Sequence, residues 1–89
     1  MNSLATVDEQ ARRIALQSAI AARSDALLHA DDRIPHLDSH ERYVALSAAL
    51  GDLAGCLWNN GGVDCEAALV EVGAWVGIWL EILAREASL

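Results

Sequence analysis

The four residues Asn59-Asn60-Gly61-Gly62 divide the second half of the chain into two apolar segments. Asparagine and glycine tolerate the left-handed backbone conformation that ends a helix, so these residues predict a helix stop and a tight turn. Before the turn, large apolar residues recur at the three- and four-residue steps of an α-helix. After it, Asp64 is placed to cap another apolar helix. The pattern predicts antiparallel helices over about residues 39–58 and 64–86.

A further helix is predicted over about residues 6–30. Thr6-Val7-Asp8-Glu9 has the spacing of a capping box, and the helix should end near Ala30 because Pro35 cannot continue it. A second capping signal at residues 38–41 opens the next helix. The first helix carries two apolar stripes on nearly opposite sides. The stripes are Val7, Ala11, Ile14 and Ala21, and Leu16, Ile20 and Leu27.

We therefore expect residues 1–89 to form a single all-α domain, a three-helix antiparallel bundle. A chain of this length buries only about 60–65% of its unfolded surface, yet 54% of its residues are hydrophobic. Partner subunits are the natural cover for the remaining apolar surface. We expect a homodimer or a larger helical assembly that completes the bundle.

Charge narrows the classes of partner. Thirteen acidic and six basic residues give a formal charge of −7, which repels phosphate backbones and argues against direct nucleic-acid binding. The same charge permits a cation site, a basic protein partner or solubility alone. The apolar stretch at residues 67–83 contains Glu71 and Glu81 and is short for a membrane span, so no membrane association is expected. Without signal-peptide features, we expect a cytoplasmic protein in which Cys56 and Cys65 are reduced thiols.

Each helix of the predicted hairpin has one isolated carboxylate. Asp52 is the only charged residue between residues 43 and 58, and Glu71 is the only one between residues 67 and 80. If the turn is centred between Gly61 and Gly62, the two carboxylates are equally distant from it and fall at the same height. Two interpretations stay open. Each side chain points to solvent, or the two share a site for a divalent cation such as Mg²⁺.

Glycine and tryptophan residues are assigned to packing. Gly51-x-x-x-Gly55 and Gly73-x-x-x-Gly77 lie inside the two predicted helices, where each glycine costs about 1 kcal/mol relative to alanine. Close approach of helix backbones would explain them. We expect Trp58, Trp75 and Trp79 to fill core or interface volume, although an indole ring could also stack on a base.

Two segments of the hairpin resemble a known family. Leu46-Ser47-Ala48-Ala49-Leu50-Gly51-Asp52-Leu53-Ala54 resembles the helix of MazG-like nucleotide pyrophosphohydrolases that reads Leu-Ala-Glu-Glu-Leu-Gly-Glu-Val-Ala. Ala68-Leu69-Val70-Glu71-Val72-Gly73-Ala74 resembles the family's Glu-Leu-x-Asp/Gln-Val-Ala-Ala, and Trp79-Leu80-Glu81 matches the Trp-Ile/Leu-Glu that often follows. The resemblance covers residues 42–83, about half of the chain.

The resemblance implies an all-α fold and a Mg²⁺ site that orients a nucleoside triphosphate for hydrolysis to the monophosphate and pyrophosphate. Carried over by position, the family's carboxylates fall at Ala48, Ala49, Asp52, Ala68 and Glu71, so only Asp52 and Glu71 remain as metal ligands. The resemblance thus implies a reduced acidic site with weak or lost catalysis and weak nucleotide or metal binding.

A different function class fits the same features. A short, acidic, compact chain is what a phage or mobile element uses to block a basic surface of a host nucleic-acid-handling complex, in the manner of an anti-CRISPR protein. A plain oligomerisation module is a third interpretation. The histidine- and aspartate-rich segment at residues 29–40 matches no standard zinc spacing and is assigned to a polar connector with helix caps.

Overall fold

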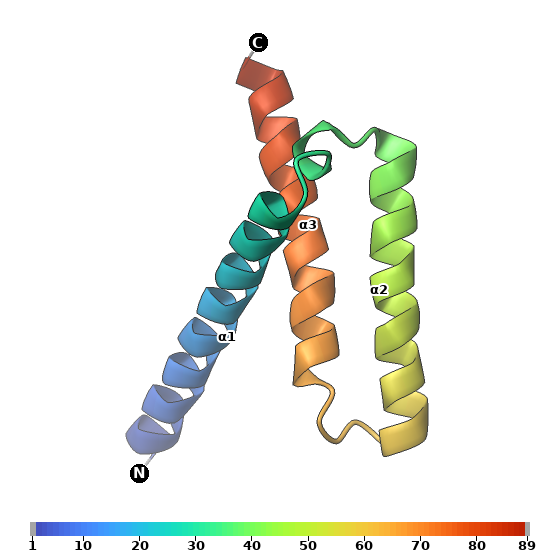
Figure 1. Cartoon of the computed structure of the whole chain (residues 1–89). Coiled ribbons are helices and arrows are strands. Elements are labelled where there is room, and N and C mark those ends of the chain that lie inside the picture. The colour runs from blue at the N-terminus through green and yellow to red at the C-terminus, as the bar shows by residue number, and fades with distance from the viewer. Residues whose placement is uncertain (1, 89) are drawn as a thin grey trace.

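The computed structural model describes residues 2–88, and all regular secondary structure in that range is helical. Three α-helices, α1 (Asn2–Ala30), α2 (Ser39–Asn60) and α3 (Glu66–Ser88), are joined through a short 3-10 helix, η1 (Ile34–His36), and the glycine turn. No strand occurs among these residues, which confirms the all-α prediction. Figure 1 shows α3 lying between α1 and α2, with α2 running antiparallel to α3.

Local signals at both ends of α2 act as the sequence predicts. The Asp38 side chain accepts a hydrogen bond from the Glu41 backbone N–H at 2.8 Å, and the Glu41 side chain accepts one from the Asp38 N–H at 3.1 Å. This reciprocal pair is a capping box. At the other end, Gly61 takes φ +60° and its N–H donates to the Leu57 carbonyl at 3.0 Å. The left-handed glycine therefore ends α2 and starts the turn.

Two predicted helix starts are wrong. Helix α1 already begins at Asn2, so Thr6 lies inside the helix and its capping-box spacing marks no boundary. Helix α3 begins at Glu66, and Asp64 lies before it in a left-handed conformation with φ +60°. Aspartate is one of the few non-glycine residues that tolerates this conformation. Asp64 thus helps to close the turn, two residues ahead of the helix that it was expected to cap.

Close packing of α1 on α3 depends on two glycines. A Cβ atom at Gly73 would come within 2.8 Å of Ile20 Cδ1, and one at Gly77 within 3.1 Å of Ser24 Oγ. The Ser24 hydroxyl donates a hydrogen bond to the Ala74 carbonyl at 3.1 Å. The Gly-x-x-x-Gly segment of α3 therefore brings two helix backbones together, as predicted, and Ile20 belongs to the stripe of α1 that faces α3.

The hydrophobic core is small and lies where η1 folds back onto α3. Ile34 of η1 packs with Ile78 and Ile82 of α3. Leu27, Leu28, Leu37 and Trp75 surround this cluster and are partly buried. Ile78 is fully buried. The core fixes the end of α1 and the connector, and it leaves much of α2 in contact with α3 alone.

The α2 face that packs on α3 is not the one that large apolar residues indicate. Arg42 and Ala49 are the buried residues of α2, whereas Tyr43, Leu50 and Leu57 are 62%, 47% and 49% exposed. Small residues let α2 approach α3 closely, and the bulkiest side chains therefore turn away. Among the other residues assigned to packing, Trp58 is exposed, and nothing lies within 4 Å of a Cβ atom built at Gly51 or Gly55. The Gly51-x-x-x-Gly55 segment of α2 therefore makes no close approach to another helix.

The two cysteines are joined, contrary to the prediction of reduced thiols. Cys56 and Cys65 form a disulfide with their Cα atoms 5.9 Å apart. They are nine positions apart in sequence, and the glycine turn between them brings the end of α2 beside the start of α3. A Cα separation of this size suits a disulfide. The correction therefore follows from the hairpin geometry, which places the pair across the turn.

The molecule is a flat and open arrangement of helices. Its principal extents are 49, 34 and 20 Å, and its radius of gyration is 15.4 Å, against about 12 Å for a compact domain of this length. Residues Glu66–Ala87 of α3 have a mean hydropathy of 1.7 and are long and apolar enough to cross a membrane, by length and composition alone. Only 17% of that apolar segment is buried inside the molecule.

Candidate functional site

The two isolated carboxylates stand at nearly the same height on the hairpin. The register is fixed by the Cys56–Cys65 disulfide near the turn and by Arg42, whose guanidinium carbon lies 5.6 Å from the Trp79 ring centre. Asp52 is four residues before Cys56, and residue 69 is four residues after Cys65, so these two positions lie opposite each other. The Arg42–Trp79 pair gives the same register. Residue 69 is two residues from Glu71. Two residues correspond to about 3 Å along a helix. The hairpin therefore brings Asp52 and Glu71 to the same level within one helical turn.

Glu71 is held by a basic residue of α1. Arg23 of α1 donates two hydrogen bonds to its carboxylate, from Nε at 2.6 Å and from Nη2 at 3.2 Å. The Glu71 side chain is 30% exposed, so this bidentate pair is partly shielded from water. The hydrogen bonds, and then the carboxylate charge, raise the pKa of Arg23 above its ordinary value. The charge of Glu71 is thus compensated within the chain.

Asp52 has a different environment. It is exposed on α2, and its carboxylate makes no hydrogen bond or ion pair within residues 2–88. It lies seven residues after Ala45, which is two helical turns, and therefore shares a side of α2 with that residue. No group of three or more histidine, cysteine or acidic side chains in the described part of the chain is arranged to hold a metal ion.

Three of the five positions where the resemblance places carboxylates of MazG-like enzymes carry methyl groups in this chain. Ala49 is 4% exposed, in the seam between α2 and α3, and Ala68 is half-buried. Ala48 is exposed. Mg²⁺ needs close to octahedral oxygen coordination, with carboxylates and phosphates supplying part of it. The side chains present do not make up such a set. A magnesium site at Asp52 and Glu71 stays a prediction, and it would have to draw Glu71 away from Arg23.

A groove opens on the side of the hairpin where η1 lies. This front groove has a volume of about 440 Å³. It is lined by Asp31, Arg33, Ile34, Leu37, Glu41, Val44, Ala45 and Trp75. Arg33 is tied to Asp31 by a guanidinium–carboxylate contact of 2.9 Å, and hydrogen bonding to Arg33 lowers the pKa of Asp31. The groove has an apolar floor and a charged rim whose only cation is already paired.

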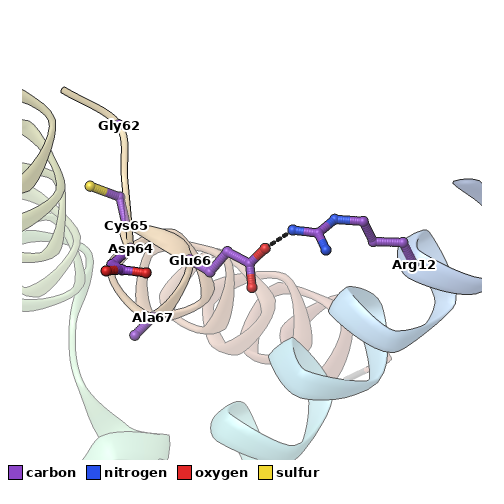
Figure 2. A pocket seen from close by; sticks show the side chains of 6 residues that line it. All are labelled: Arg12, Gly62, Asp64, Cys65, Glu66 and Ala67. Carbon is purple, nitrogen blue, oxygen red and sulfur yellow. Dashed lines mark hydrogen bonds and ion pairs between the residues drawn. The ribbon is translucent and has the colours of Figure 1, made fainter. Parts of the chain in front are cut away.

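A second hollow, of about 590 Å³, lies at the start of α3 and is shown in Figure 2. Arg12 of α1 reaches across it to the Glu66 carboxylate. A helix N-terminus attracts anions, but here the carboxylates of Asp64 and Glu66 already supply negative charge. An added phosphate would meet two like charges. The hollow is therefore an ion-paired contact between α1 and α3 and is unsuited to anion binding.

Arg42 is a structural residue that the sequence interpretation overlooked. It is 5% exposed, and its Nε donates to the carbonyls of Leu37 and Asp38 at 3.0 and 3.2 Å. Its Nη2 lies 3.5 Å from Glu86 Oε1, while Nη1 is buried without a partner in the described chain. The seven-residue spacing between Arg42 and Ala49 could have indicated that Arg42 is buried. Arg42 falls in line with Ala49 at seven residues, on the small-residue side of α2.

Comparison of this chain with protein-family models, curated proteins and solved structures found no match.

Proposed function

We propose that this protein acts by binding a basic surface of another protein and does not hydrolyse nucleotides. The observation that carries the proposal is the state of its arginines. Five of the six are each paired with a carboxylate of the same chain, so they offer little positive charge to a partner. Thirteen acidic residues less these five leave eight carboxylates without an arginine partner among residues 2–88.

The acidic charge is concentrated where α1 passes into α2. Residues 25–41 contain five carboxylates and one arginine, and we name this segment the acidic connector. Asp31, Asp38 and Glu41 are engaged in ion pairing or capping. Asp25 and Asp32 are exposed and have no arginine partner, although Asp25 Oδ1 lies 3.4 Å from Nδ1 of His29. Surface charge of one sign steers association with a surface of the opposite sign. Basic surfaces that bind nucleic acid are the partner class of matching charge.

Capture by the full-length protein, with a paired charge control, tests this proposal. The Asp25→Asn/Asp32→Asn variant and a Gln10→Lys/Asn59→Lys variant raise net charge equally, but only the first changes the acidic connector. Partners captured from a bacterial lysate should be basic nucleic-acid-binding proteins, be displaced by added duplex DNA, and fall at least several-fold with the first variant alone. Equal losses with both variants, or capture insensitive to DNA, would contradict the proposal.

Nucleotide hydrolysis of the MazG type is the second candidate, and the common height of Asp52 and Glu71 is what favours it. The methyl groups at positions 48, 49 and 68 oppose it, because a metal-bound water needs several first-sphere ligands to be positioned for in-line attack. The test is pyrophosphate release from a panel of nucleoside triphosphates with Mg²⁺. We expect none above the blank. Release that disappears in Asp52→Asn and Glu71→Gln would establish the hydrolase and overturn our first proposal.

A further inference from the structure

The α2–α3 hairpin has two sides, and only one is covered. On its front side, Glu71 bonds to Arg23 of α1, Ile78 packs against Ile34 of η1, and Ala45 lines the front groove. Successive residues of an α-helix are about 100° apart, so residues two positions apart point in nearly opposite directions. Residues two positions before each front residue therefore lie on the other side of the hairpin, whereas Gly73, two positions after Glu71, lies at the edge of α3 that α1 covers.

That other side carries large apolar side chains. Leu69 and Val76 stand two residues before Glu71 and Ile78, and Tyr43 and Leu50 stand two before Ala45 and Asp52. Seven-residue steps extend the two rows to Leu57 and Leu83, and a four-residue step from Val76 adds Leu80. We name the combined surface the back face, which consists of Tyr43, Leu50, Leu57, Leu69, Val76, Leu80 and Leu83. The register of the hairpin interleaves the two rows along its length.

The back face is exposed and carries no charge. Its seven side chains are between 41% and 62% exposed. The charged residues in the middle of the two helices, Asp52 and Glu71, both lie on the front side. Isolated apolar residues are normal on a protein surface, but a contiguous row across two helices marks an interaction site.

The size of the back face matches a small dimer interface. From the turn end at Leu57 to Leu83 it is about 28 Å long, and two adjacent helices are about 20 Å wide. The face thus covers roughly 600 Å², so two copies would bury roughly 1,200 Å², the lower bound of stable specific interfaces. The large radius of gyration of the isolated chain agrees with a molecule that is not closed on itself.

We propose that the back face binds the back face of a second copy of this chain, so that two hairpins form a four-helix core. A two-fold axis would place the same uncharged rows against each other, which is the contact least opposed by a net charge of −7 on each copy. A lipid surface is the less favoured occupant, because a leaflet that contains anionic lipid would repel a chain of charge −7. This inference does not depend on the proposed binding of a basic partner.

Light scattering after size-exclusion chromatography of the full-length chain tests the inference over a wide concentration range. The chain mass is 9.5 kDa, and we expect the measured mass to approach twice that value as concentration rises. Val76→Glu and the milder Leu80→Gln should shift the protein to monomer by raising the dimer Kd at least 100-fold and about 5-fold, respectively. Circular dichroism of each variant at low concentration is the check that the monomer still folds.

A matched control uses exposed apolar residues of α1. Val7 and Ile14 are 58% and 63% exposed, and Val7→Glu/Ile14→Glu adds negative charge outside the back face. This variant should dimerise like the unchanged protein. A monomer at every concentration overturns the inference. So does a dimer lost only with the α1 variant, or flotation of the unchanged chain with phosphatidylcholine vesicles in place of dimer formation.

Discussion

Gly73 and Gly51 occupy equivalent places in two Gly-x-x-x-Gly segments, yet their surroundings differ. A Cβ atom at Gly73 would meet Ile20 Cδ1 at 2.8 Å and Cγ1 at 3.0 Å, so the isoleucine would have to move. A Cβ atom at Gly51 meets nothing within 4 Å. Gly73→Ala should therefore destabilise the protein by about 1–3 kcal/mol, which is the usual cost of overpacking.

Gly51→Ala is the paired experiment. Because the residue is exposed inside a helix, alanine should stabilise the protein by about 0.5–1 kcal/mol. Urea denaturation of both variants at low protein concentration measures the difference. Equal effects of the two substitutions would mean that close approach of α1 to α3 does not explain the glycine at position 73.

His29 gives the protein a pH-dependent contact at the end of α1. Its Nδ1 lies 2.7 Å from the Asp25 carbonyl, and this hydrogen bond, followed by the Asp25 charge, raises the pKa of His29 above its ordinary value of 6.5. A raised folded-state pKa means that protonation favours the folded state. The stabilisation is complete below the unfolded-state pKa and is lost as pH rises through the folded-state pKa.

An NMR titration of the His29 ring tests this assignment. Its midpoint should lie above that of histidine in a short peptide, and Asp25→Asn should lower it only in part, since the backbone carbonyl remains. A midpoint at or below the peptide value would contradict the contact. The net effect on stability should be small, because the side chain is well exposed.

Single residues also show where sequence interpretation is limited. Equal spacing from the turn was enough to predict the common height of Asp52 and Glu71. The partner of Glu71 could not be predicted, because Arg23 is 48 residues away and its approach depends on how α1 crosses α3. Arg42 was overlooked for a related reason. A charged residue beside a run of apolar residues suggests exposure, and only its position in line with Ala49 indicates burial.

Among the elements, the turn between α2 and α3 is held by the Cys56–Cys65 disulfide. A crosslink over nine residues restricts the unfolded chain, which stabilises the folded state by about 2–3 kcal/mol. Reduction removes this stabilisation and should therefore lower the melting temperature. Circular dichroism with and without a phosphine reductant measures the difference. The Cys56→Ala/Cys65→Ala variant should melt at that lower temperature and ignore the reductant. No change on full reduction would show that the crosslink adds nothing.

The far end of the hairpin depends on Arg42. Arg42→Met keeps much of the side-chain volume but leaves the Leu37 carbonyl without its donor, whereas the Asp38 carbonyl keeps the Arg42 backbone N–H, so we expect a loss of about 1–3 kcal/mol. Glu86→Gln should cost less than about 1 kcal/mol, because the Glu86 side chain is 57% exposed and its pair with Arg42 is solvated. Chemical denaturation compares the two variants. A larger loss for Glu86→Gln would mean that the ion pair dominates.

Helix ends were predictable where a backbone motif requires a residue type. Asp38, Glu41 and Gly61 are such cases, and each acts as expected. The start of α1 was misplaced because a capping-box spacing can also occur inside a helix. The face of α2 that packs on α3 does not follow from the size of its apolar residues, because Ala49 is buried in the seam with α3 while Leu50 and Leu57 are exposed.

At the scale of the whole molecule, two kinds of association should respond to salt in opposite directions. Binding of a basic partner depends on attraction between opposite charges, so salt should weaken it. Pairing of two back faces is apolar and opposed by repulsion between two chains of charge −7, so salt should strengthen it. Sedimentation or scattering at low and high ionic strength distinguishes them. A self-association that salt weakens would indicate ion pairs across the contact.

The all-α class and the number of helices followed from periodicity and turn residues. The openness of the arrangement did not, because it depends on the crossing of α1 over α3, which is set by Gly73, Gly77 and the core around Ile34. The excess of apolar residues did predict that much of the apolar surface would remain exposed. Whether a second copy covers it is the question that the scattering experiment addresses.

The small core around Ile78 affects the concentration at which this protein could persist in a cell. Few side chains are buried in the single chain, so an isolated copy would unfold often and be open to proteases. Mutual coverage of two back faces would slow that turnover, and its effect grows with concentration. Sparse copies would then be cleared quickly while abundant ones persist, which gives the protein a threshold of synthesis below which it does not accumulate.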